Sequence, residues 1–223
     1  MFLKNLIRGS NLKLSNDSRI QEFMNFFQAD EYGHEADIGE SDLGYGWMHY
    51  SMIRLTKPKR ILCVGSRHGY IPAILAQTCK ENKFGHVDFV DAGYGENDKS
   101  HWTGVGFWKT QEGGNIFNGF GLGKYISTFI QTTAEFTKKY TQNKYSYIYI
   151  DADHSYKGIA FDYKKTWPML VRGGFMSFHD ISIKEKKPEG NYGVWKLWDK
   201  LEKTNTTIKF PFSGSGLGII QKT

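Results

Sequence analysis

The chain has 223 residues, of which 39% are hydrophobic and 23% are charged, and its formal net charge is +6. This length suits one α/β domain with a modest extension, and the composition is that of an ordinary globular protein. No apolar run is long enough to cross a bilayer, and the first residues lack the long apolar segment of a secretory signal. The two cysteines, Cys63 and Cys79, indicate neither a disulfide framework nor a zinc cluster, so we expect a cytoplasmic protein.

The lysines are spread along the chain instead of being gathered in one segment. The pairs Lys138–Lys139 and Lys164–Lys165, for example, belong to different predicted helices. A nucleic-acid-binding protein usually concentrates its basic residues on one face or arm, so this pattern favours ordinary solvated lysines. We therefore expect neither a nucleic acid nor a membrane as a partner, and a homo-oligomer stays open.

Two helices are predicted before the first strand. Residues 18–28 carry apolar side chains at helical spacing and should form an amphipathic helix. Residues 42–55 are expected to form a second helix. Its inward-facing side chains should be Trp47, Met48, Met52 and Leu55. Residues 1–56 are therefore expected to be an N-terminal helical extension, and residues 57–223 the main domain.

Strands and helices alternate through the rest of the chain. The expected strands cover residues 61–64, 86–91, 125–131, 145–151, 174–179, 207–210 and 216–221. The expected helices cover residues 70–80, 134–140, 155–170 and 194–203. This alternation predicts βαβ units and a mainly parallel sheet, in which ligands bind at the carboxyl ends of the strands.

Residues 92–124 interrupt the alternation and are expected to be an insertion. They contain many glycines and show no clear period. Loops longer than about 15 residues are uncommon in compact domains and usually functional. We expect this one to be a lid over the ligand edge of the sheet, and a loop packed on the core or a subunit contact is the rival interpretation. The aromatic residues of such a lid would be Trp102, Phe107, Trp108, Phe117 and Phe120.

Candidate cofactor contacts follow the first strands. The segment from Gly65 to Gly69 opens a helix, and its glycines permit close backbone approach to a ligand. Asp91 ends the second strand, where an acid can hold both ribose hydroxyls of an adenosine-containing cofactor. A plain tight turn at the glycines and a cap at Asp91 are the alternatives. The candidate cofactor-binding residues are Gly65, Ser66, Arg67, Gly69, Asp91, Ala92, Thr132 and Asp151.

Carboxylates and imidazoles follow the fourth and fifth expected strands. Two adjacent parallel strands would present these side chains at one edge of the sheet. Carboxylates there suit a hard cation such as Mg²⁺, and an imidazole suits a base or a ligand for softer ions. For Asp153, a helix cap is an equally good interpretation. The cluster comprises Asp151, Asp153, His154, His179 and Asp180.

The order of these motifs resembles that of the class I S-adenosylmethionine-dependent methyltransferases. The resemblance runs from about Tyr45 to the end of the chain, through the segments 150–156 and 178–180. More closely, the chain is similar to the group that contains macrocin-type and rhamnosyl sugar O-methyltransferases and cephalosporin-hydroxylase-like proteins. The resemblance implies a Rossmann-like three-layer α/β sandwich with a mainly parallel seven-stranded sheet, whose last strand is antiparallel.

The resemblance also implies a site and a reaction. The cofactor would be S-adenosyl-L-methionine, and a divalent metal, Mg²⁺ or Mn²⁺, would lie at Asp151, His179 and Asp180. Asp151 and His154 would be the catalytic residues, with His154 removing the proton from a hydroxyl of a small-molecule or saccharide acceptor. The chain departs from the family pattern at Cys63, normally an acid, and at His179, normally the first acid of a pair.

Two other functions stay open. The segment 151–153 is also a D-x-D motif, as in metal-dependent glycosyltransferases that bind nucleotide sugars. Those domains usually begin with their nucleotide-binding strand, whereas a long segment precedes Ile61 here. The third interpretation is a non-catalytic binding module that kept the fold and lost the chemistry.

Overall fold

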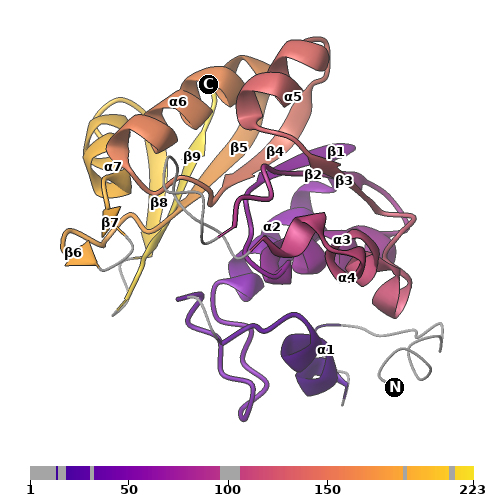
Figure 1. The fold of residues 1–223 in the computed structure, drawn as a ribbon. Coiled ribbons are helices and arrows are strands. Elements are labelled where there is room, and N and C mark those ends of the chain that lie inside the picture. Colours follow the sequence, from indigo (N-terminus) through magenta and orange to yellow (C-terminus); the bar gives the residue numbers. More distant parts are fainter. Residues whose placement is uncertain (1–13, 15–18, 31–32, 96–105, 188–189, 211–213) are drawn as a thin grey trace.

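The computed structural model describes residues 14, 19–30, 33–95, 106–187, 190–210 and 214–223 (Figure 1). Their strands form a seven-stranded sheet in the order β3-β2-β1-β4-β5-β9-β8, and a two-stranded ribbon, β6-β7. The strands of the sheet are β1 (Arg60–Val64), β2 (His86–Asp91), β3 (Ile126–Ile130), β4 (Tyr145–Ile150), β5 (Leu170–His179), β8 (Thr206–Phe210) and β9 (Leu217–Gln221). The ribbon is made of β6 (Lys186–Lys187) and β7 (Gly190–Asn191).

Helices cover both faces of this sheet (Figure 1). The α-helices are α1 (Ile20–Phe26), α2 (Gly46–Thr56), α3 (Tyr70–Asn82), α4 (Gln111–Asn115), α5 (Thr133–Lys139), α6 (Tyr156–Thr166) and α7 (Val194–Leu201). Short 3₁₀ turns are η2 (Phe107–Lys109), η3 (Ile116–Gly121) and η4 (Trp167–Met169). The α5, α6 and α7 helices lie on one side, and α1 to α4 lie on the other.

The strand directions confirm the expected fold class. The first five strands pair in parallel, β9 pairs antiparallel with β5, and β8 pairs antiparallel with β9. The last strand of the chain, β9, is therefore antiparallel to the other six strands of the sheet. The chain order reverses between β1 and β4, which makes the gap beside their carboxyl ends the usual ligand-binding place of such a sheet.

Alternate residues of the central strands enter two separate cores. Ile61 and Cys63 of β1 pack into the core shared with α1, α2 and α3, whereas Leu62 and Val64 pack into the core under α5, α6 and α7. Successive side chains of a strand point to opposite faces, so a strand covered on both faces has to be apolar throughout. This requirement explains the uninterrupted apolar run that marks β1 in the sequence.

Two expectations at element ends are wrong. Leu55 was expected to face the core, but it is 81% exposed, because the inward face of α2 is formed by Gly46, His49 and Ile53. The helix expected to reach residue 170 ends at Thr166 and is followed by η4. Pro168 lacks a backbone N–H and cannot continue the hydrogen-bond pattern of α6, so the chain passes through η4 into β5.

The insertion aromatics that the structure describes are packed inside the protein, which contradicts their expected role as a lid. Trp108 is only 4% exposed, and Phe117 and Phe120 are also buried. The ring of Trp108 lies 4.5 Å from that of Phe89 on β2, and the ring of Phe117 is stacked 6.0 Å from that of Phe27. The rival interpretation, a loop packed on the core, is the correct one for residues 107–122. Trp102 lies outside the described residues.

The N-terminal helices belong to the same hydrophobic core as the sheet. Phe23 and Met24 of α1 and Ile53 of α2 are buried in the cluster that also contains Ile61 and Phe89. The division of the chain at residue 56 therefore stays a prediction. None of the helices in the described ranges has the length and apolar character that a bilayer crossing requires.

Replacing Trp108 by alanine should destabilise the protein, because the indole fills a buried space between β2 and Phe117. Removing a buried Trp or Phe side chain costs about 3 to 5 kcal/mol of unfolding free energy. We expect a loss of this size for Trp108→Ala in urea unfolding followed by circular dichroism.

The matched control is Phe84→Ala, since Phe84 is 48% exposed and its removal should change stability by no more than about 0.5 kcal/mol. A Trp108→Ala protein with unchanged stability would contradict the packing described here and favour a lid.

Candidate functional site

The strand register places four of the candidate site residues in one row at the carboxyl edge of the sheet. Val64 of β1 is level with Val90 of β2 and with Ile150 of β4, and Ile150 is level with Phe178 of β5. The residues that follow these four are therefore aligned. They are Gly65, Asp91, Asp151 and His179.

A cleft of about 1480 Å³ opens above this row. Nearly every residue singled out in the sequence lines it, while Gly69 does not. The lining includes Gly65, Ser66, Arg67, Asp91, Ala92, Thr132, Asp151, His154, His179 and Asp180. The predicted cofactor contacts and the predicted acid–imidazole cluster thus share one continuous cavity.

The glycine loop is shaped by close contact with the neighbouring strand. Gly65 has φ +80°, and a Cβ at this position would clash with the carbonyl oxygen of Asp151 and with Ala152. Gly69 has φ +91°, and its N–H donates to the Oγ of Ser66 at 3.0 Å. Left-handed backbone without a side chain is what glycine permits, so the loop can lie directly beside the end of β4.

Asp91 is held by backbone donors on the floor of the cleft. Its Oδ1 accepts the N–H of Gly93 at 2.7 Å, and its Oδ2 accepts the N–H of Ser66 at 3.2 Å. Burial raises the pKa of Asp91 to about 6, although these two hydrogen bonds oppose the shift. The carboxylate is therefore fixed in position, with spare acceptor capacity toward the cavity.

Two other residues singled out in the sequence have no free polar group in the cleft: Thr132 caps a helix, and Cys63 is buried. The hydroxyl of Thr132 accepts the N–H of Glu135 at 3.2 Å, and Glu135 in turn accepts the N–H of Thr132 at 2.8 Å. This capping box begins α5, so Thr132 offers the cleft a wall and not a free side chain. Cys63 is fully buried, and burial raises the pKa of its thiol.

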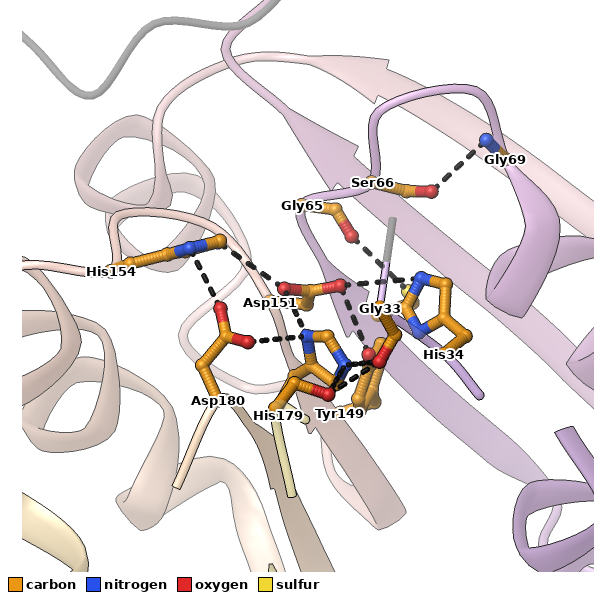
Figure 2. A network of polar contacts seen from close by, with 12 residues as sticks. Gly33, His34, Gly65, Ser66, Gly69, Tyr149, Asp151, His154, His179 and Asp180 are labelled. Atoms are coloured by element: carbon orange, nitrogen blue, oxygen red, sulfur yellow. Dashed lines mark hydrogen bonds and ion pairs between the residues drawn. The ribbon is translucent and has the colours of Figure 1, made fainter. Parts of the chain in front are cut away.

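Asp151 is the centre of the acid–imidazole cluster (Figure 2). Its Oδ1 lies 3.3 Å from Nε2 of His154 and 3.4 Å from Nδ1 of His179, and its Oδ2 accepts the O–H of Tyr149 at 3.0 Å. Asp180 completes the cluster at 2.8 Å from Nδ1 of His154 and 3.3 Å from Nδ1 of His179. The structure thus brings the three expected metal ligands and the expected base together.

The cluster contains one residue that the sequence did not indicate. The Nε2 of His34 lies 3.9 Å from Oδ2 of Asp151, and its ring centroid lies 4.6 Å from that of His179. His34 comes from the loop between α1 and α2, where a lone histidine has no motif or spacing to mark it. Only the three-dimensional fold brings it to the cleft.

The charges of the cluster compensate one another. Burial alone would lower the pKa of His154, but the carboxylates of Asp180 and Asp151 outweigh this effect and raise it to about 10. The pKa of His179 rises to about 9 for the same reason. The imidazoles hold the pKa of Asp151 well below its usual range against the opposing effect of burial. His34 differs, because burial and the charge of His179 lower its pKa to about 4.

Asp153 takes no part in the cluster. Its Oδ1 accepts the N–H of Ser155 at 2.9 Å, and Ser155 caps α6 by accepting the N–H of Gly158 at 3.0 Å. The second acid of the D-x-D motif is therefore used at the start of a helix, which favours the helix-cap interpretation and weakens the glycosyltransferase alternative.

Several groups in the cleft have the spacing that metal ligands require. His34, Asp151 and His179 offer ligand atoms within 4.8 Å of one another, and so do Asp151, His154 and Asp180. The two sets share Asp151. Chemically, the cleft joins a glycine loop with a fixed acid to a cluster that can bind a cation or move a proton.

Solved structures with the same fold include several methyltransferases. An O-methyltransferase from Bacillus cereus in complex with SAH superposes with a TM-score of 0.60 at 13% identity, covering 93% of this chain and 92% of that one. The O-methyltransferase TomG from Streptomyces achromogenes in complex with SAM has a TM-score of 0.60 at 12% identity, with 93% and 91% covered. The SAH-bound methyltransferase PaMTH1 of Podospora anserina has a TM-score of 0.59 at 17% identity, with 93% and 89% covered.

Sequence comparison identifies the family. An uncharacterised protein of Sinorhizobium fredii is 27% identical over 73 residues, which span 33% of this chain and only 8% of that protein. The family described as "Methyltransferase domain" matches residues 62–181, which is more than half of the chain. This match spans the glycine loop, Asp91 and the cluster around Asp151, and it shows that the chain belongs to the methyltransferase domain family.

Proposed function

We propose that this protein transfers a methyl group from S-adenosyl-L-methionine to a hydroxyl of a small-molecule or saccharide acceptor. The observation that carries the proposal is the row formed by Gly65, Asp91 and Asp151 along one cleft, with His154 beside it. These residues line one cavity, where they would serve as cofactor contacts and as a proton-accepting cluster. A glycosyltransferase needs no such combination.

The cofactor would lie across the ends of β1 and β2. Gly65 lines the cleft, where its backbone would face the methionine part, and Asp91 would accept hydrogen bonds from both ribose hydroxyls. The two complexes with SAH and SAM named above, from B. cereus and S. achromogenes, support this choice of cofactor at the level of the fold. A sugar as acceptor rests on the motif resemblance alone.

The acceptor would lie beside the acid–imidazole cluster. The sulfonium methyl group is electrophilic, so the protein mainly has to align the acceptor oxygen and remove its proton. Asp180 holds Nδ1 of His154 at 2.8 Å and so fixes the orientation of the imidazole. His154 is the proposed base, and Asp151 holds its Nε2 at 3.3 Å. Because the two carboxylates raise the pKa of His154 to about 10, the imidazole has to lose its proton before it can act, which a higher pH or a bound cation that offsets the carboxylate charge would allow.

The residues of the cluster fit a divalent cation. The carboxylates of Asp151 and Asp180 lie 3.4 and 3.3 Å from Nδ1 of His179 in the cleft. Asp151, His179 and Asp180 would hold Mg²⁺ or Mn²⁺. When bound, such a cation polarises a hydroxyl and makes its proton easier to remove.

Asp91→Ala should weaken the binding of S-adenosylhomocysteine at least about tenfold, equivalent to ~1.4 kcal/mol. The variant loses the acceptor for the ribose hydroxyls, while the glycine loop keeps its left-handed conformation. Isothermal titration calorimetry of the folded variant measures the effect. Unchanged affinity would remove Asp91 from the site.

The pH dependence of the same titration provides the control. The carboxyl of Asp91, with a pKa near 6, faces the negative charge of Asp151 and the positive charge of Lys109. Only its ionised form accepts two hydroxyl donors, so the affinity of the native protein should rise between about pH 5 and about pH 7 and level off above. Asp91→Ala should flatten this rise.

His154→Ala should lower methyl transfer by about 10²- to 10⁴-fold, the usual contribution of a general base, with little change in S-adenosylhomocysteine affinity. The assay follows methyl transfer from labelled cofactor to a panel of sugar and catechol hydroxyls.

EDTA should abolish turnover, and Mg²⁺ or Mn²⁺ should restore it. Full turnover by metal-free protein in chelator would contradict the proposed metal site, and His154 would remain as a metal-independent base.

A further inference from the structure

We infer that His34, Asp151 and His179 form a transition-metal site with two nitrogen donors and one carboxylate, completed by the loop between α1 and α2. The inference deepens the proposed function, and it rests on the metal centre of that proposal. It changes the ligand set, because Asp180 is replaced by His34. It also narrows the cation expected: of Mg²⁺ and Mn²⁺ it disfavours Mg²⁺, and it adds the later transition metals.

The three ligand groups already surround one point. Nε2 of His34 is 3.9 Å from Oδ2 of Asp151, and Nδ1 of His179 is 3.4 Å from its Oδ1. Ligand atoms bound at about 2.1 Å to one ion lie roughly 3 to 4 Å from one another. The two distances to the Asp151 carboxylate fall in this range, and the ligand atoms of all three residues lie within 4.8 Å of one another, so side-chain rotations would bring them onto one ion.

His34 is a buried polar side chain that points into this site. It is 7% exposed, and its Nδ1 has no hydrogen-bond partner among the described residues. Its Nε2 faces Asp151 from a distance too long for a hydrogen bond. Burying an imidazole without partners is costly. An ion between Nε2 and Asp151 would give Nε2 a partner and offset part of this cost, while Nδ1 would stay as it is.

His179 is oriented as metal-binding histidines are. Its Nε2 lies 3.0 Å from the carbonyl oxygen of Gly33 and 3.0 Å from Oγ of Ser215. A carbonyl oxygen can only accept, so Nε2 donates, and in the neutral imidazole the lone pair of Nδ1 faces Asp151. A ligand histidine commonly donates its other N–H to a backbone carbonyl in this manner. The loop residues 33 and 34 thus provide both a ligand and the support of a second ligand.

The donor set decides the preferred ion. An all-oxygen set suits Mg²⁺, whereas two imidazoles and one carboxylate favour Mn²⁺, Fe²⁺, Co²⁺, Ni²⁺ or Zn²⁺. Asp180 would then lie outside the ligand set, with its Oδ2 2.8 Å from Nδ1 of His154 and its Oδ1 3.3 Å from Nδ1 of His179. The cluster would be divided into a metal site on one side of Asp151 and a base with its orienting acid on the other.

The test is a titration of the chelator-treated, metal-free protein with Co²⁺, followed by calorimetry and by visible absorption. We expect one Co²⁺ per chain and much weaker binding of Mg²⁺. Loss of an outer-shell partner alone costs about 10- to 100-fold in metal affinity, so His34→Ala should weaken Co²⁺ binding by about 100-fold or more. His34→Gln, which keeps more of the buried volume, should show the same loss if the alanine variant is unstable.

Two histidine variants are the controls. His86 lies at the start of β2 and contacts Ser127 at 2.9 Å, at the opposite end of that strand from Asp91, so His86→Ala should keep native affinity. His154→Ala removes a group that lies 3.3 Å from the Asp151 carboxylate, so it should weaken Co²⁺ binding, but by less than His34→Ala.

Three outcomes overturn the inference. They are Co²⁺ affinity unchanged by both His34 variants, affinity lost with His154 but not with His34, and no Co²⁺ binding by the native protein. Titration with S-adenosylhomocysteine separates these failures from failure of the proposed function. Intact Co²⁺ binding without binding of S-adenosylhomocysteine would overturn methyl transfer and support the metal site.

Discussion

The carboxylate of Asp151 is the group on which the arrangement of the cleft depends. It is nearly buried at the end of β4, and three imidazoles and the hydroxyl of Tyr149 surround it. Removing a carboxylate from water costs several kcal/mol unless opposite charges and hydrogen bonds compensate it. The strand end, the loop carrying His34 and the end of β5 therefore have to converge on this position.

The glycine loop is coupled to the same position by steric contact. Gly65 lies so close to the Asp151 carbonyl that no side chain fits between β1 and β4. Asp180, next to the cluster, has a φ of +60°, a left-handed conformation that costs a non-glycine residue about 1 to 3 kcal/mol. Strain of this kind persists where surrounding contacts impose it, and here His154 and His179 both contact the Asp180 carboxylate. A bound cofactor and the acid–imidazole cluster would therefore be held in a fixed relation.

The parts of the fold that depend on residues close together in the sequence were predicted well. The apolar run at β1 and the alternation of strands and helices follow from burial on both faces, which leaves a direct trace in sequence. The residues after each strand were also predictable, because parallel strands end at one edge. Gly65, Asp91, Asp151 and His179 line the cleft for this reason.

Features that depend on distant contacts could not be predicted. Trp108 stands among glycines, which suggested a mobile lid, but it packs against Phe89 in the core. Leu55 has helical spacing, yet it lies on the exposed side of α2. His34 reaches the cleft only because α1 and α2 pack on the sheet. No local signal in the sequence records that contact.

A crystal structure of the protein with S-adenosylhomocysteine tests the central claim most directly. The account predicts that both ribose hydroxyls contact Asp91, that the methionine part lies along Gly65, and that the sulfur faces the cluster of Asp151 and His154. S-adenosylhomocysteine bound outside this cleft, or with its ribose away from Asp91, would contradict the account.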